Sequence, residues 1–198
     1  NLSENFKKAK NFSKLGIETG DVKLNLDKMM KNKEKAVSIL TKGVEFLFKK
    51  NKVTYLKGFG SFVSDKKISV KGEDGKKKEI EAKNIIIATG SEAMPMPNVE
   101  FDEKTIVSST GALSLKEVPK SLVVVGGGYI GLEMGSVWSR LGAEVNVIEF
   151  LDHITPGMDR EISNEFKKIL TKQGIKFKMG SRVDSVKNKG SKVLITYT

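Results

Sequence analysis

Three glycines with the spacing G-x-G-x-x-G, Gly126, Gly128 and Gly131, follow a run of valines in the second half of the sequence. The first glycine permits a tight turn, the second leaves the backbone accessible to a pyrophosphate, and the third lets a helix pack closely on a strand. Glu149 follows 18 positions after Gly131, where a carboxylate can bind two ribose hydroxyls and repel a 2′-phosphate. Residues 150–158 contain no Lys or Arg to neutralise such a phosphate. The pattern predicts a dinucleotide-binding turn that prefers NAD to NADP.

The sequence around this turn alternates apolar strands with amphipathic helices. Apolar runs at residues 121–125 and 145–149 predict buried strands, and residues 128–141 and 159–173 predict helices that end at glycines. A third strand at 175–178 completes a strand–helix–strand–helix–strand order, which is typical of a parallel sheet with right-handed crossovers. Further strand candidates lie at residues 182–186 and 192–197.

The first half of the sequence has a different organisation. Helices are predicted at residues 3–12 and 26–50, the second with one apolar stripe that we expect to be buried. Its members are Met29, Met30, Ala36, Val37, Leu40, Val44 and Leu47. Short runs at 53–56, 59–63 and 67–70 predict a small antiparallel β-meander, closed by an apolar strand at 84–90 that would be buried on both faces. The linker Met94-Pro95-Met96-Pro97 places the domain boundary between residues 1–93 and 94–198.

Composition argues against several classes of function. The net charge is +11, but the lysines are spread along the whole chain and arginines number three, so a nucleic-acid interface is not expected. No apolar run is long enough to span a membrane. With no cysteine and one histidine, the sequence offers no disulfide and no expected metal site. His153 lies in a Gly/Pro-containing loop, and we expect a solvated side chain without a catalytic role.

Glu133 permits two interpretations. It lies within the helix that follows the glycine turn, where an exposed glutamate ordinarily forms a surface ion pair. Its position two residues after Gly131 could instead direct it toward the reactive end of the dinucleotide. The sequence alone leaves both interpretations open.

Beyond these local signals, the sequence resembles a known family along nearly its whole length. Residues 126–138, GGGYIGLEMGSVW, resemble the NAD-binding segment of the dihydrolipoamide dehydrogenases, which are flavin-dependent pyridine nucleotide-disulfide oxidoreductases. Residues 24–30 resemble that family's segment before its long helix, residues 84–91 its Ala-Thr-Gly-Ser flavin strand, and residues 106–113 the start of its nucleotide domain.

The resemblance implies cofactor contacts at particular positions. For NAD these are Gly126, Gly127, Gly128, Tyr129, Ile130, Gly131, Leu132 and Glu133 in the turn, Glu149 at the ribose and Val183 beside the adenine. For FAD they are Gly60 at the adenine end and Thr89, Gly90 and Ser91 at the dinucleotide. The implied fold is α/β: a Rossmann-like, doubly wound parallel NAD-binding domain, plus the C-terminal part of a FAD-binding domain with a small antiparallel β-meander.

Several features of the family have no counterpart in this sequence. These are the first glycine-rich FAD motif, the redox-active Cys-x4-Cys segment, and the C-terminal dimerisation domain with its His–Glu acid/base pair. We therefore expect a central piece of a longer enzyme, with no catalytic residues of its own, inactive alone and unable to retain FAD. An apolar surface at residues 85–88 would then be uncovered.

The longer enzyme implied by the resemblance passes electrons from dihydrolipoamide through a disulfide and FAD to NAD. Its implied partners are a second identical subunit and the dihydrolipoamide-bearing acyltransferase of 2-oxo acid dehydrogenase complexes. The expected location is cytoplasmic, or the mitochondrial matrix in a eukaryote. Three alternatives remain at this point: another NAD-linked flavin disulfide oxidoreductase or NADH oxidase, a stand-alone NADH-binding module, and a basic nucleic-acid binder.

Overall fold

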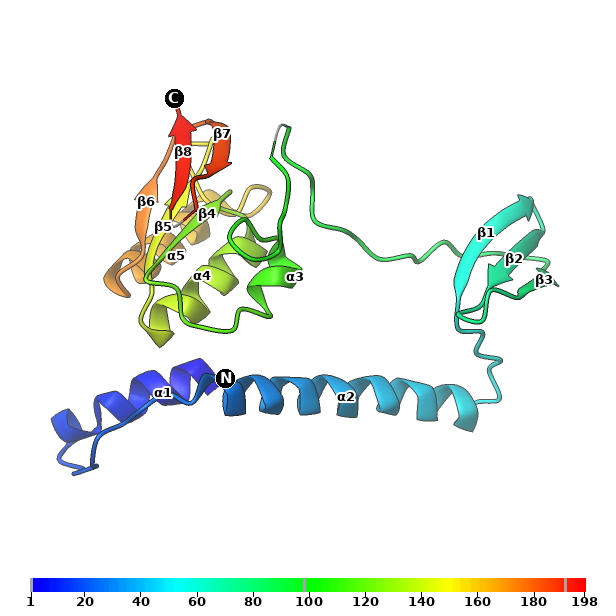
Figure 1. Cartoon of the computed structure of the whole chain (residues 1–198), viewed down its shortest axis with the longest axis horizontal. Coiled ribbons are helices and arrows are strands. Elements are labelled where there is room, and N and C mark those ends of the chain that lie inside the picture. Colours follow the sequence, from blue (N-terminus) through cyan, green and yellow to red (C-terminus); the bar gives the residue numbers. More distant parts are fainter. Residues whose placement is uncertain (1, 98, 191) are drawn as a thin grey trace. The chain divides into compact units, whose positions relative to one another are not determined.

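The structure, a computed structural model, describes residues 2–97, 99–190 and 192–198 (Figure 1). These residues form two compact units. The smaller unit is Lys31–Glu92, and the larger one joins the residues up to Met30 with Ala93–Thr198. One division falls beside the linker that the sequence indicated, while the residues up to Met30 group with the larger unit. The assignment of residues 1–93 and 94–198 to two cofactor domains stays a prediction.

A three-stranded parallel sheet forms the centre of the larger unit (Figure 1). Its strands are β4 (Ser121–Val125), β5 (Glu144–Ile148) and β6 (Lys176–Lys178), in that spatial order. Helix α4 (Tyr129–Leu141) connects β4 to β5, and α5 (Arg160–Lys172) connects β5 to β6. The predicted parallel α/β arrangement is thus confirmed, with boundaries within one residue of those expected from apolar periodicity.

The core lies between these helices and one face of the sheet. Strand alternation places Leu122, Val124, Val145 and Val147 on the same face, because Leu122 pairs with Val145 and Val124 with Val147. Both helices pack there through side chains of the buried cluster and its surroundings, which include Leu132, Trp138, Leu141, Phe166 and Leu170. The indole Nε1 of Trp138 donates to the carbonyl of Ala112 at 3.1 Å, so this large side chain is buried with its polar atom paired.

Local signals explain where the two helices begin and end. Gly142, with φ of +120°, terminates α4 in a conformation that side chains disfavour. Asp159 caps α5, since its Oδ1 accepts hydrogen bonds from the backbone N–H groups of Glu161 and Ile162 at 2.8 and 3.2 Å.

Further elements complete the larger unit. Strands β7 (Val183–Asn188) and β8 (Val193–Tyr197) lie where strands were predicted, and they form an antiparallel pair. Helix α1 (Leu2–Lys10) packs on α4, where Arg140 Nε donates to Ser3 Oγ at 3.0 Å, and the 3-10 helix η1 (Phe12–Leu15) follows. The short helix α3 (Ser109–Ala112) was not predicted; it begins at the cap Ser108.

The smaller unit contains a meander of β1 (Phe59–Ser64), β2 (Lys67–Lys71) and β3 (Lys77–Glu81). The antiparallel meander is confirmed, but its third strand is 77–81. The strands predicted at 53–56 and 84–90 are wrong. A strand needs a neighbour for its N–H and C=O groups, and the described residues offer none there. Ile86 and Ile87 are instead 90% and 71% exposed, so the expected uncovered apolar surface is present.

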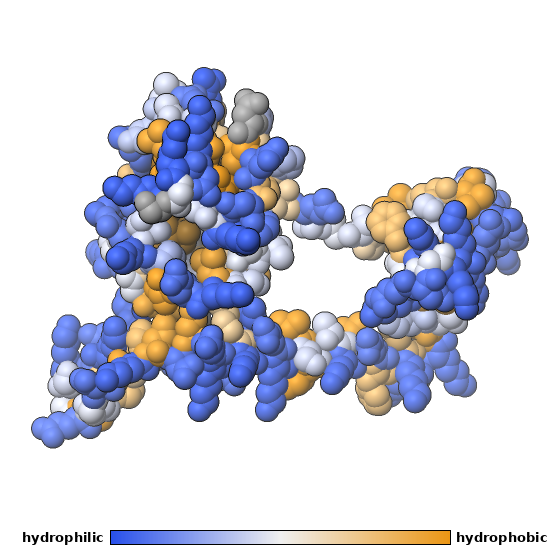
Figure 2. Space-filling model, viewed as in Figure 1, coloured by the Kyte–Doolittle hydropathy of each residue, from blue (hydrophilic) through white to orange (hydrophobic). Residues whose placement is uncertain are grey.

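Helix α2 (Leu26–Lys50) has the predicted bounds but not the predicted burial. Met29 and Met30 pack beside the core cluster of the larger unit. Beyond them the stripe is exposed, and Val37 and Leu40 are 53% and 71% accessible. Figure 2 shows apolar atoms at the surface of this helix. Periodicity identifies a face that can be buried, whereas burial also requires a partner, and no described residue covers this stretch.

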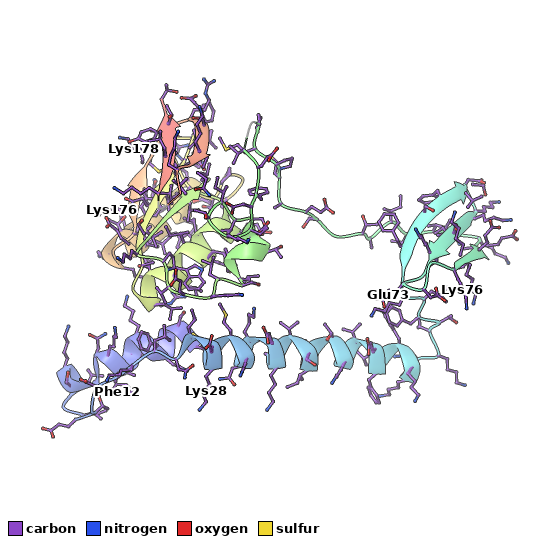
Figure 3. The ribbon with its side chains drawn as sticks, in the orientation of Figure 1. Phe12, Lys28, Glu73, Lys76, Lys176 and Lys178 are labelled. Carbon is purple, nitrogen blue, oxygen red and sulfur yellow. The ribbon has the colours of Figure 1, made fainter. Side chains whose placement is uncertain are left out.

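Several exposed lysines contact a neighbour in their own unit, and Figure 3 labels Lys76, Lys176 and Lys178 among them. Lys176 on β6 pairs with Glu144 at 2.5 Å, and Lys178 lies 4.8 Å from the ring centre of Tyr197. In the meander, Lys57 pairs with Glu73 at 3.1 Å. Such exposed pairs contribute little to stability. In the part of the chain that the structure describes, no helix combines the length and apolar content needed to cross a membrane.

Candidate functional site

The glycine turn connects β4 to α4, and each of its three glycines is there for a different structural reason. Gly126 has φ of +100°, and its N–H donates to the Ile148 carbonyl at 2.8 Å. A Cβ at Gly128 would meet no atom within 4 Å, so the space beside its backbone is open. A Cβ at Gly131 would lie 2.8 Å from Val124 Cγ1. The turn therefore has the tight bend, the accessible backbone and the close helix–strand packing that its spacing predicted.

The start of α4 can bind an anion. The N–H groups of a helix's first turn have no carbonyl partner within the helix, and the helix dipole adds positive potential there. Gly128 caps α4 without a side-chain hydrogen bond, and the first turn contains no acidic residue. Tyr129 and Ile130, the first two helical residues, are 67% and 45% exposed. A phosphate can reach these N–H groups.

Glu149 lies directly behind the turn, at the end of β5. Its side chain is inside, with the residue 7% exposed. Oε2 accepts from the N–H of Gly127 at 2.5 Å, and Oε1 accepts from the N–H of Leu151 at 2.7 Å. A carboxylate oxygen has two lone pairs, so each oxygen keeps the capacity for one further hydrogen bond. The sequence predicted that Glu149 binds a ribose, but it gave no sign of these hydrogen bonds to the backbone of Gly127 and Leu151.

The loop that follows β5 holds Gly127 from its other side. The N–H of Thr155 donates to the Gly127 carbonyl at 2.8 Å. Thr155 Oγ1 lies 2.8 Å from Ser163 Oγ on α5, and both residues are buried. Sequence reasoning missed Thr155 and Ser163, because residues 155–157 read as an ordinary Thr-Pro-Gly turn and no spacing rule connects them to the glycines.

A charged cluster occupies the same loop. His153 Nδ1 lies 2.8 Å from Asp152 Oδ1 and 3.1 Å from Arg160 Nη1, and Arg160 also pairs with Asp152. The hydrogen bonds from His153, and then from Arg160, lower the pKa of the Asp152 carboxyl. The expected solvated histidine is wrong in this respect, since the His153 side chain is only 18% exposed. Arg160 lies just beyond the segment that lacked basic residues, and Asp152 neutralises it.

The remaining predicted NAD residues have mixed environments. Leu132 is fully buried in the core, and its N–H donates to the Gly128 carbonyl. Glu133 is exposed, and within the described residues it forms no ion pair; its role toward the dinucleotide stays a prediction. Val183 is buried at the start of β7, two residues after Ser181, whose N–H donates to the Glu149 carbonyl at 2.9 Å.

The predicted FAD residues all belong to the smaller unit. Gly60 pairs with Val70 in the meander, and Thr89, Gly90 and Ser91 lie in exposed, irregular backbone. Gly90 has φ of +81° and open space where a Cβ would be. Accessible backbone at these glycines suits close approach of a dinucleotide, and their contact with FAD stays a prediction.

Comparison with known proteins decides the family. A sequence model described as pyridine nucleotide-disulphide oxidoreductase matches residues 3–198. The chain belongs to this family. A dihydrolipoamide dehydrogenase from Chaetomium thermophilum is 61% identical over 91% of this chain, and a mitochondrial dihydrolipoyl dehydrogenase from Pisum sativum is 54% identical over 93%. The chain spans 36% and 37% of these two relatives.

A solved structure supports the fold of this family member. The crystal structure of LpdA from Mycobacterium tuberculosis matches with a TM-score of 0.87 and 22% sequence identity. The match covers 100% of this chain and 43% of that protein. The predicted fold class, an α/β protein with a Rossmann-like parallel sheet and a small antiparallel meander, is therefore confirmed.

Proposed function

We propose that this chain provides the NAD site, and part of the FAD site, of a flavoprotein that oxidises dihydrolipoamide and reduces NAD. The observation that carries the proposal is the glycine turn braced by Glu149, with the Gly127 N–H 2.5 Å from Oε2. The open space at Gly128 suits a pyrophosphate. The two relatives named as dihydrolipoyl or dihydrolipoamide dehydrogenases support the choice of substrate.

The residues of this chain would bind and orient cofactors rather than react. The α4 N-terminus would bind the pyrophosphate, Glu149 the adenosine ribose, and the exposed Glu133 would lie toward the nicotinamide. When bound, the flavin and nicotinamide supply the two-electron and hydride chemistry. Gly60, Thr89, Gly90 and Ser91 would contribute backbone contacts to FAD.

The partners and location follow from the same proposal. A protein with this chain would form a dimer with a second copy and oxidise the dihydrolipoamide of the acyltransferase in a 2-oxo acid dehydrogenase complex. The Pisum sativum relative is named mitochondrial, which supports the mitochondrial matrix as the location.

A calorimetric titration with NADH and NADPH tests the nucleotide site. We expect NADH to bind more tightly than NADPH, and Glu149→Ala to narrow the difference. Glu144→Ala is a matched control, because Glu144 begins β5, at the end opposite to Glu149, and its carboxylate pairs at the surface with Lys176. A folded wild-type chain that binds neither nucleotide would contradict the proposal for this chain.

The proposed activity needs a separate assay. A polypeptide that adds this chain to the remaining regions of its relatives should reduce NAD with dihydrolipoamide as the electron donor. Glu149→Ala in that polypeptide should raise the KM for NAD. Reduction of NAD by other dithiols at equal rates, without a preference for dihydrolipoamide, would argue against the substrate assignment.

A further inference from the structure

Both main-chain groups of Gly127 are held by the segment that follows β5. Its N–H donates to Glu149 Oε2 at 2.5 Å, and its carbonyl accepts from the N–H of Thr155 at 2.8 Å. These bonds orient the peptide groups on both sides of Gly127 toward the inside of the unit. Gly128 and the first N–H groups of α4 remain on the open side. The geometry of the glycine turn therefore depends on where Thr155 is held.

Thr155 adopts a backbone conformation that its side chain disfavours. Its φ is +51°, and the residue is 4% exposed. A β-branched residue at positive φ is uncommon, and it persists only where its surroundings hold it. The neighbouring Ile154 is fully buried, and a Cβ at Gly127 would lie 3.1 Å from its Cγ2. The loop is thus packed tightly against the glycine turn.

Ser163 connects this loop to α5. The serine is 1% exposed, and its hydroxyl donates to the Asp159 carbonyl at 2.9 Å. A hydroxyl has one proton to donate, so in the 2.8 Å contact between the two hydroxyls Thr155 is the donor and Ser163 the acceptor. A continuous chain of hydrogen bonds therefore connects the first turn of α5 to Thr155, and Thr155 to Gly127.

We propose that Thr155 and Ser163 are positioning residues of the dinucleotide site, acting through Gly127. Their paired hydroxyls hold the strained loop in place, and its N–H in turn holds the Gly127 carbonyl. This inference rests on the proposed function, since it assumes that the glycine turn binds NAD. Neither hydroxyl would contact the nucleotide; each would set the orientation of the backbone that does.

Substitutions that differ by one hydroxyl test this role in the whole chain. Thr155→Val keeps the branched shape but removes the donor, whereas Thr155→Ser keeps the donor. Ser163→Ala removes the acceptor. Thr171→Ala is the control, because Thr171 lies on the same helix and, among the residues that the structure describes, its hydroxyl bonds only to the Lys167 carbonyl, at 2.8 Å.

Two measurements are made on each variant: the calorimetric Kd for NADH, and the hydrogen-exchange rate of the Gly127 amide by NMR without nucleotide. We expect Thr155→Val and Ser163→Ala to weaken NADH binding about fivefold to tenfold, the effect of one lost hydrogen bond, and to speed Gly127 exchange. Thr155→Ser and Thr171→Ala should match the wild type in both. A role confined to stability would lower the melting temperature and speed the exchange of amides throughout the larger unit, without changing the Kd for NADH and without a larger effect at Gly127.

The NADH affinities of these variants decide whether Thr155 and Ser163 position the dinucleotide site. Unchanged NADH affinity in Thr155→Val would overturn the inference, as would an equal loss of affinity in Thr171→Ala. If Ser163→Ala does not fold, the two Thr155 variants carry the comparison. A wild-type chain that binds no NADH would count against the proposed function, while the exchange rate of Gly127 would still decide whether the two hydroxyls hold the turn.

Discussion

Replacing Gly128 by Ala should separate nucleotide binding from folding. Gly128 has φ of −71° and ψ of 162°, which any residue adopts, and no atom lies within 4 Å of its Cβ position. Alanine is a poorer helix cap by about 0.5–1 kcal/mol. It also lowers the entropy of the unfolded chain, which stabilises by about 0.4–1 kcal/mol. These effects oppose each other, so we expect the unfolding free energy to change by less than about 0.5 kcal/mol.

Binding should respond much more strongly. The new methyl group would occupy the space that the pyrophosphate is expected to enter, so NADH affinity should fall about tenfold or more, equivalent to about 1.4 kcal/mol. Gly131→Ala should behave in the opposite way. Its Cβ would lie 2.8 Å from Val124 Cγ1 and 3.1 Å from the Gly126 carbonyl oxygen. Overpacking costs about 1–3 kcal/mol, and the better helix propensity of alanine recovers about 0.5–1 kcal/mol.

Urea unfolding and calorimetric titration with NADH measure both quantities on each variant. Loss of affinity with unchanged stability is the expected result for Gly128→Ala, and loss of stability for Gly131→Ala. Wild-type NADH affinity in Gly128→Ala would refute the reasoning, because the ligand would then not approach this backbone. Wild-type stability in Gly131→Ala would show that the contact between helix and strand is not tight.

Three further predictions follow from other parts of the chain. Hydrogen bonds from the N–H groups of Thr105, Lys104 and Ile106 lower the pKa of Asp102 from 3.8 to about 2. Because the folded state favours the carboxylate, the free energy of unfolding should fall as the pH drops through that range. Acid-unfolding curves of Asp102→Asn should show a smaller fall. Trp138→Phe removes the donor to Ala112 and part of a side chain that is 2% exposed, so urea unfolding should show a loss of about 1–3 kcal/mol. The purified chain should carry no flavin absorbance, whereas a yellow protein would show that the FAD contacts of this chain suffice.

Much of the fold follows from local patterns in the sequence. The bounds of α2, α4 and α5 agree with apolar periodicity and capping residues to within one residue. The glycine turn was also predictable, since a tight bend, an open approach and a close packing contact each require glycine for a local steric reason. Position 149 was identifiable because the end of the next parallel strand lies beside the turn.

Other features depended on what the folded chain brings together. Residues 84–90 have strand composition but no neighbouring strand among the described residues, and the apolar stripe of α2 has no cover beyond Met30. An apolar composition shows that a segment can be buried, whereas burial also requires another part of the protein to pack against that segment. For the same reason the pairing of Asp152 with Arg160 became visible only in the structure.

The sequence by itself therefore determined the glycine turn, the order of strands and helices around it, and the position of the carboxylate. Only the tertiary structure decided that the Glu149 carboxylate accepts hydrogen bonds from the N–H groups of Gly127 and Leu151. It also decided that Thr155, paired with Ser163, donates its N–H to the Gly127 carbonyl. The first set follows from steric rules within a few residues of chain. The second set consists of hydrogen bonds between segments that folding alone brings within reach, and no local spacing encodes them.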